Sequence, residues 1–232
     1  MASNNQIKLP RVIFLVGSAG SGKSTIVNII KKDFPFYKTL NDLEELKRLL
    51  KVEENSKNGT QFKILDNGGF DIIDPVIWDE VLVTCSSEIK KDSYYTFEFS
   101  RGVDKNYLDK MSLRKNKVYL HSFEIILNNL TFLNMCDMLI IHANSDYSTR
   151  RRRNIERKKN GRHFVAESVM AEVYNEDNFY FNHSDLNFGF LNLAYKIPVY
   201  SIDNSIDLSE ENMRTYLSGR IYDALHHYSQ NS

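Results

Sequence analysis

The chain of 232 residues is poor in cysteine and contains no long apolar run. Its two cysteines, Cys85 and Cys136, lie far apart and match no metal-ligand spacing, so we expect them to be small core residues of a reduced intracellular protein. No apolar run approaches the ~18 residues that a membrane-spanning helix needs. The first ten residues are polar and lack the apolar core of a signal peptide. These absences predict a cytoplasmic protein without a membrane partner.

An excess of charge of either sign is also missing, because 30 basic residues balance 30 acidic ones. There is therefore no global attraction toward nucleic acid, which is not favoured as a partner and would need a local basic patch. Hydrophobic residues make up 42% and charged residues 26% of the chain, as in ordinary globular proteins. Without an internal repeat or a low-complexity linker, residues 1–232 are predicted to form a single domain.

The most informative segment follows a short β-branched run at 11–16, which predicts a buried strand. It matches G-x-x-x-x-G-K-[ST], the phosphate-binding loop of nucleoside-triphosphate-binding proteins, at every required position. Apolar residues at helical spacing then continue until Asp33-Phe34-Pro35. The predicted cofactor-binding residues are Gly17, Ser18, Ala19, Gly20, Ser21, Gly22, Lys23, Ser24 and Thr25.

The residue types of this loop suit a triphosphate. Glycines bring backbone N–H groups close to phosphate oxygens, and the helix that follows adds its positive end to the same anion. Lys23 can reach the outer phosphates, and the hydroxyl of Ser24 can ligate Mg²⁺. The loop therefore predicts ATP and Mg²⁺ as cofactors, with Ser24 as the metal-binding residue.

Strands alternate with helices along the rest of the chain, which predicts an α/β fold with a parallel sheet. Beside the strand at 11–16, strands are expected near 36–38, 94–99, 136–142 and 197–202. The segment 178–193 is unusually aromatic. It can line an acceptor pocket or pack in the core or at an interface.

Glu98 is a carboxylate near the carboxyl end of the apolar strand 94–99. Ligands of open α/β sheets bind outside the carboxyl ends of strands, so an ion or a ligand is one candidate partner for this charge. A salt bridge to Arg101 or to a lysine is the other. Asp66, in the turn 66–69, is a second carboxylate that can serve the metal, and the sequence leaves this choice open.

The stretch 150–162 is the most basic part of the chain. Arg153 and Arg157 are four residues apart, so on a helix they share one face and can clamp one anion. After a strand of a phosphate-loop domain, we interpret them as a clamp on the phosphoryl group during transfer. A nucleic-acid patch and a solvated helix face are the alternatives.

With these segments in order, the chain resembles the P-loop kinases of small molecules, the nucleoside and nucleoside-monophosphate kinase group. The resemblance implies a three-layer P-loop NTPase fold, with a five-stranded parallel sheet flanked by helices and a basic lid at about 146–165. It also implies that Asp42 and Arg101 bind the substrate. Glu98 would hold Mg²⁺ through water or act as general base, although nucleotide kinases usually have aspartate there.

The sequence thus predicts an ATP- and Mg²⁺-dependent phosphotransferase. It would move the γ-phosphoryl group to a hydroxyl or phosphate of a small molecule, a nucleoside or a nucleotide, with a nucleic-acid end as another possible acceptor. The predicted catalytic residues are Lys23, Glu98, Arg153 and Arg157. The alternative function is a GTPase-like or ATPase switch acting through protein partners, suggested by Asp66-x-x-Gly69.

Overall fold

The computed structural model describes residues 7–55, 62–64, 70–74, 76–134, 137–184, 187–194 and 196–231. Within these ranges the main sheet has seven strands in the order β2-β5-β1-β6-β9-β8-β7. The first five of that order are parallel to one another. They are β2 (Tyr37–Asn41), β5 (Tyr94–Glu98), β1 (Val12–Val16), β6 (Met138–Asn144) and β9 (Lys196–Asp203).

The prediction of a five-stranded, wholly parallel sheet was therefore incomplete. Two antiparallel strands extend it, β8 (Phe188–Asn192) beside β9 and β7 (Asn182–His183) beside β8. The connection between β8 and β9 spans only 193–195. So short a link cannot cross over the sheet, so the two strands pair antiparallel. The aromatic segment 178–193 thus supplies sheet strands and core side chains, which accords with the packing alternative.

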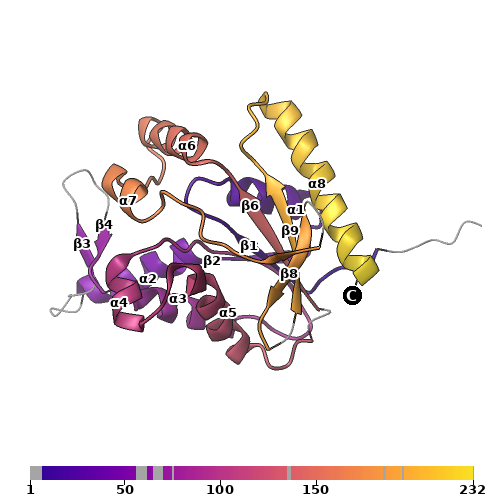
Figure 1. Ribbon diagram of the computed structural model, residues 1–232, viewed down its shortest axis with the longest axis horizontal. Coiled ribbons are helices and arrows are strands. Elements are labelled where there is room, and N and C mark those ends of the chain that lie inside the picture. Colours follow the sequence, from indigo (N-terminus) through magenta and orange to yellow (C-terminus); the bar gives the residue numbers. More distant parts are fainter. Residues whose placement is uncertain are drawn as a thin grey trace, which may run out of the picture.

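Helices cover both faces of the sheet and make three layers (Figure 1). One face packs on α1 (Lys23–Asp33) and α8 (Glu210–Asn231). The other packs on α2 (Asp42–Asn55), α3 (Ile77–Ser87) and α5 (Val118–Asn129). Successive residues of a strand point to opposite faces, so in β1 Ile13 and Leu15 join the first core while Phe14 joins the second.

The remaining elements lie mostly around the carboxyl ends of the parallel strands (Figure 1). The segment predicted as a lid, about 146–165, contains α6 and the loop toward α7, and its closing motion stays a prediction. Among the described residues no helix is both long and apolar enough to cross a membrane. The further elements are the hairpin of β3 (Phe62–Ile64) and β4 (Phe70–Ile72), α4 (Lys105–Met111), the 3₁₀ turn η1 (Lys115–Lys117), α6 (Tyr147–Lys159) and α7 (Glu167–Glu172).

The packing of α5 on the sheet can be tested at Phe123. Its ring is fully buried, with centroids 5.2 Å from Phe14 and 5.5 Å from Phe99. Phe123→Ala should lower the free energy of unfolding by ~3–5 kcal/mol in a denaturant titration, because a large cavity remains. Phe132→Ala, at a side chain 38% exposed, is the control and should cost less than ~1 kcal/mol. Equal losses in both variants would contradict this layer arrangement.

Candidate functional site

The loop 17–25 joins β1 to α1 and depends on its glycines. Gly17, Gly20 and Gly22 have φ angles of 138°, 83° and 94°, in the region that side chains disfavour. A Cβ atom on Gly22 would collide with the side-chain amide of Asn204. Gly22 also caps α1, which has no side-chain cap. The first N–H groups of α1 are therefore left to a ligand or to solvent.

Lys23 lies buried at the start of α1. Its Nζ donates to the carbonyl oxygens of Gly17 at 2.9 Å and Ser18 at 3.2 Å, which closes the loop on itself. Burial lowers the pKa of the Lys23 ammonium, while the nearby carboxylates Glu98 and Asp42 act to raise it. An anion in the loop would further favour the charged form of this lysine.

Two polar atoms in and beside the loop are buried and have no hydrogen-bond partner among the described residues. They are Oγ of Ser21 and Nη1 of Arg153. The guanidinium of Arg153 is close to Gly22 and also donates to the carbonyl oxygen of Asn204 at 2.9 Å. Unpaired buried polar groups are costly, and phosphate oxygens accept hydrogen bonds. The residues around the loop therefore fit a phosphate-bearing ligand.

Glu98 is the carboxylate that contacts the phosphate loop. Its Oε1 accepts from Oγ of Ser24 at 2.8 Å, and its Oε2 accepts from Nδ2 of Asn41 at 3.1 Å. Asp66, the other candidate, lies outside the described residues. A carboxylate beside a hydroxyl offers the oxygen ligands that Mg²⁺ prefers, directly or through water. The pair Ser24–Glu98 therefore fits the expected metal.

Asp42 lies next to Glu98, at the start of α2. It is buried, and its Oδ2 accepts from the backbone N–H of Ser100 at 2.7 Å. Burial raises the pKa of Asp42 to about 6, although the Ser100 N–H and the charge of Lys23 oppose the shift. The carboxyl group can therefore exchange a proton close to neutral pH.

Arg101 lines the same region but its guanidinium is turned toward α3 and α5. Its Nε donates to Oγ of Ser122 at 2.9 Å, and its Nη2 donates to the carbonyl oxygen of Trp78 at 2.8 Å. The same nitrogen forms an ion pair with Asp79 at 3.3 Å. At least two of its three nitrogens are thus engaged in the fold. Its predicted role as a substrate residue stays a prediction.

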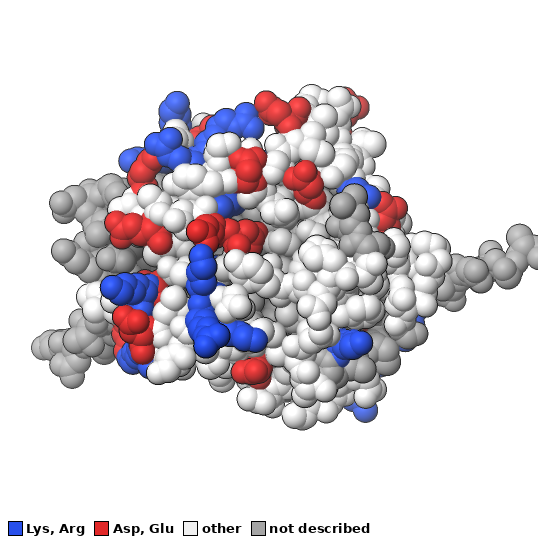
Figure 2. All heavy atoms as spheres, viewed as in Figure 1, with Lys and Arg blue, Asp and Glu red and all other residues white. Residues whose placement is uncertain are grey.

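The basic helix α6 lies beside the phosphate loop, not on the far side of the molecule. Asp146 caps the start of this helix by accepting a hydrogen bond from the N–H of Thr149. Lys and Arg side chains gather over the helix in Figure 2. Arg153 contacts Asn204, as above, and Arg157 lines both cavities described below. Both predicted clamp residues therefore lie at the site.

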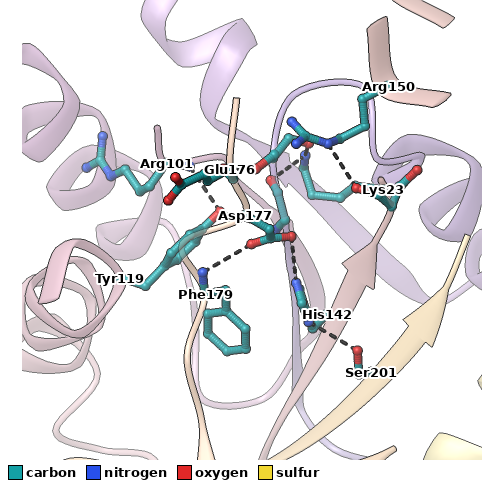
Figure 3. Close-up of polar contacts among 12 residues, drawn as sticks. Lys23, Arg101, Tyr119, His142, Arg150, Glu176, Asp177, Phe179 and Ser201 are labelled. Carbon is teal, nitrogen blue, oxygen red and sulfur yellow. Dashed lines mark hydrogen bonds and ion pairs between the residues drawn. The ribbon is translucent and has the colours of Figure 1, made fainter. Parts of the chain in front are cut away.

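Arg150, from the first turn of α6, is fully buried and connects this helix to neighbouring segments through hydrogen bonds. Its guanidinium donates to the carbonyl oxygens of Ser145, Tyr174 and Asn175. The last two belong to residues 174–179, which we call the return segment because it leads from α7 back to the sheet. Burial lowers the pKa of Arg150, and Asp177 opposes the shift. Figure 3 shows Arg150 and Lys23 on the same side of Glu176 and Asp177, which belong to this segment.

The return segment is also tied to the sheet through His142 (Figure 3). The ring of His142 lies between Asp177 at 2.9 Å and Oγ of Ser201 at 3.1 Å, and it packs on Phe179. Burial acts to raise the pKa of Asp177, but His142 and the N–H of Phe179 hold it below its ordinary value. His142 is thus a hydrogen-bonded packing residue that joins the sheet to the return segment.

Two cavities meet at the phosphate loop. One, of about 210 Å³, runs from Lys23 and Ser24 past Glu98 and Asp42 to α3, α4 and α7. The other, of about 670 Å³, lies between α1, α6 and the start of α8. Gly22 and Arg157 line both. A ligand that fills one cavity therefore ends within reach of a ligand in the other.

Some residues of the site carry no motif that the sequence could have revealed. The hydroxyl of Tyr119, on α5, accepts from the N–H groups of Gly17 at 3.2 Å and Arg101 at 3.1 Å. Nδ2 of Asn204, after β9, donates to the carbonyl oxygen of Ser21 at 2.7 Å. Burial raises the pKa of Tyr119, so it stays neutral. For Asn204, the only signal in the sequence is its position in the turn after the last strand, at the edge of the sheet where ligands bind.

No protein-family model matches the chain, and no curated protein matches it. Among solved structures it is similar to a sugar kinase from Janibacter sp., with 11% identity, TM-score 0.49 and coverage of 94% of this chain and 98% of that one. It is also similar to a gluconokinase from Sinorhizobium meliloti, with 13% identity, TM-score 0.47 and coverage of 96% of this chain and 98% of that one. Kti12 from Chaetomium thermophilum, in complex with ADP-AlF3, is 11% identical, with TM-score 0.47 and coverage of 92% of this chain and 98% of that one.

These matches include kinases, as the resemblance read from the sequence led us to expect. Their TM-scores lie below 0.5 and their identities are 11–13%, so nothing about the activity of this chain follows from them.

The bridge made by Tyr119 can be tested with Tyr119→Phe. Removing the hydroxyl leaves the N–H groups of Gly17 and Arg101 without their acceptor in a buried place, so the free energy of unfolding should fall by ~1–3 kcal/mol. Denaturant titration measures the loss. Tyr222→Phe, at an exposed tyrosine of α8, is the control. Unchanged stability of Tyr119→Phe would contradict a structural bridge to the loop.

Proposed function

We propose that the protein is an ATP- and Mg²⁺-dependent phosphotransferase that acts on a hydroxyl group of a small molecule. One observation carries this proposal. The phosphate loop, with Ser24 and Glu98, lies where two cavities meet, and Arg157 lines both. Such a junction suits transfer from a nucleotide in one cavity to an acceptor in the other.

The larger cavity is the proposed nucleotide side. The loop's backbone N–H groups and Lys23 would hold the phosphates, and Ser21 and Arg153 would gain partners for their unpaired atoms. Asn204 fixes the loop through Ser21 and lines this cavity. Ser24, with Glu98, would hold Mg²⁺, which neutralises charge on the phosphates when bound.

Asp42, rather than Glu98, is the residue to which we assign the general base. Both were candidates for acceptor chemistry, but Glu98 is engaged by Ser24 and Asn41. Asp42 lines the smaller cavity and has a pKa of about 6. Its carboxylate would take the proton of the acceptor hydroxyl. The acceptor oxygen then bonds to the γ-phosphorus as the bond to the β-phosphate oxygen breaks, and ADP leaves.

Arg157, with Arg153, would neutralise the negative charge of the group being transferred. Phosphoryl transfer depends mostly on positioning and on such charge stabilisation. The nucleotide-switch alternative rests on Asp66 and Gly69, which lie outside the described residues, and no observation here favours it.

The activity is tested with ATP labelled in its γ-phosphate and a panel of small hydroxyl compounds, nucleosides, nucleotides and 5′-hydroxyl DNA. We expect label on a small acceptor. Arg157→Ala should cut kcat by ~10²-fold or more while ATP still binds, because the clamp acts mainly in the transition state. Lys159→Ala, at an exposed basic residue of the same helix, is the control. Release of phosphate with every acceptor unlabelled, and with GTP preferred, would contradict the proposal.

The role of Asp42 predicts a pH dependence. Activity should rise with pH through about 6 as Asp42 loses its proton, and Asp42→Asn should remove this rise and lower kcat by ~10²–10⁴-fold. Because the folded-state pKa is raised, the stability that Asp42 contributes is full below its unfolded value and is lost as pH rises through about 6.

Asp42→Asn should therefore be as stable as the parent protein or more stable at pH 7.5, by up to ~1–3 kcal/mol. Thermal unfolding and a pH–rate profile measure both effects. Glu44→Gln, at an exposed carboxylate in the same turn of α2, is the control. A pH–rate profile of Asp42→Asn that keeps the rise near pH 6 would exclude Asp42 as the base.

A further inference from the structure

The lining of the smaller cavity limits which acceptors can bind there, because its walls beyond Glu98 are mostly apolar. The side chains come from α2, β4, α3, the loop before α7, α7 itself and the residue after it. They are Leu43, Ile72, Trp78, Val165, Val169 and Val173. The loop after β5 closes against the last of these, since the N–H of Val103 donates to the carbonyl oxygen of Val173 at 2.8 Å. Apolar walls favour an uncharged body over a solvated ion.

Beyond Glu98, the ionised groups of this wall are two carboxylates and one guanidinium, that of Arg101. The carboxylates are those of Asp42 and Asp104, and within the described part of the chain neither forms an ion pair with a lysine or an arginine. Asp104 caps α4 by accepting from the N–H of Tyr107 at 2.9 Å. Hydrogen bonds from backbone N–H groups leave the negative charge of a carboxylate in place. An anion entering here would therefore meet repulsion.

Among the cations that line the cavity, Lys23 and Arg101 act on the charge of Asp42, but each is held by hydrogen bonds to the protein. Arg101 is 3% exposed, and its Nε and Nη2 are engaged by Ser122, Trp78 and Asp79. Lys23 and Arg157 lie at the phosphate-loop end. These three are the lysines and arginines that line the cavity within the described part of the chain.

His163 also lines this cavity, and burial and the charge of Lys47 lower its pKa. It is therefore largely uncharged at neutral pH and supplies little positive charge.

We infer that the acceptor is a small uncharged hydroxyl compound with an apolar or ring-shaped body, and that it carries no phosphate or carboxylate group. The inference rests on the proposed phosphotransferase activity. Its hydroxyl would donate to Asp42, and its body would lie against the apolar walls. An anionic counterpart would leave its charge buried without a partner, beside two carboxylates. The cavity of about 210 Å³ limits the acceptor to less than drug size, for which ~300–1,000 Å³ is usual.

The test uses pairs of compounds that share a skeleton and a free primary hydroxyl. They are a nucleoside and its 3′-monophosphate, an aldohexose and its aldonic acid, and a hydroxymethyl cyclohexane with and without a carboxylate. With γ-labelled ATP, the uncharged member of at least one pair should be labelled with a kcat/KM ~10²-fold above its anionic partner. Equal or faster labelling of the anionic members would overturn the inference and leave the phosphotransferase activity standing.

If no compound is labelled, ligand-observed NMR with a non-hydrolysable ATP analogue still decides the matter. Binding of uncharged members alone would support the inference while counting against the proposed activity. Binding of neither member of any pair, or of the anionic members, would overturn it.

A charge placed in the apolar wall should change the preference. Val169→Arg, at a half-buried position of α7, should shift the ratio of uncharged to anionic substrate at least tenfold toward the anion. Val169→Gln is the uncharged control of similar length. Leu43→Lys provides a second site on α2 in case the first variant misfolds, which circular dichroism would reveal. An unchanged ratio in both folded cationic variants would contradict the inference.

Discussion

The site depends on the parallel register of β5 between β1 and β2. In this register Glu98 lies opposite Leu15 of β1 and opposite Asn41 of β2. The carboxylate therefore ends beside the first turn of α1, where Ser24 donates to it at 2.8 Å. A shift of one residue would turn Glu98 to the other face of the sheet. The pairing of β1, β5 and β2 thus determines which carboxylate meets the phosphate loop.

The phosphate loop is held from several directions by buried hydrogen bonds. Tyr119 bonds to its first residue from α5, Asn204 bonds to Ser21 from the end of β9, and Arg150 packs beside Gly20 from α6. Such contacts are strong where water is excluded. The loop is therefore shaped before any ligand arrives, and donors that need no rearrangement are the basis of electrostatic stabilisation in enzymes.

Charge is divided unevenly between the two cavities. Among the described residues, six lysines and arginines and three carboxylates line the larger cavity, while three of each line the smaller one, and Arg157 belongs to both linings. In the proposed reaction this division is useful, because the triphosphate needs cations and the acceptor hydroxyl needs a proton acceptor. The balanced net charge of the chain conceals this local separation.

The phosphate loop and the parallel strands could be predicted from the sequence, because each depends on residues close together in the chain. The strand, glycine-rich loop and helix of residues 11–33 follow from backbone preferences and apolar spacing within a few residues, so the phosphate loop was predictable, as were the five parallel strands. The antiparallel β8 was not recognised, since its aromatic residues suit a strand, a core or a pocket equally well.

The chain by itself determined the phosphate loop, the positions of its carboxylates and the basic helix. Only the tertiary structure decided their partners. It brought Ser24 to Glu98 across 74 positions of sequence, turned Arg101 toward Ser122 and Asp79, and buried Asp42 so that its pKa rises to about 6. Hydrogen-bond partners, burial and the electrostatic surroundings of a side chain arise from packing between distant segments. The spacing of residues along one segment does not determine them.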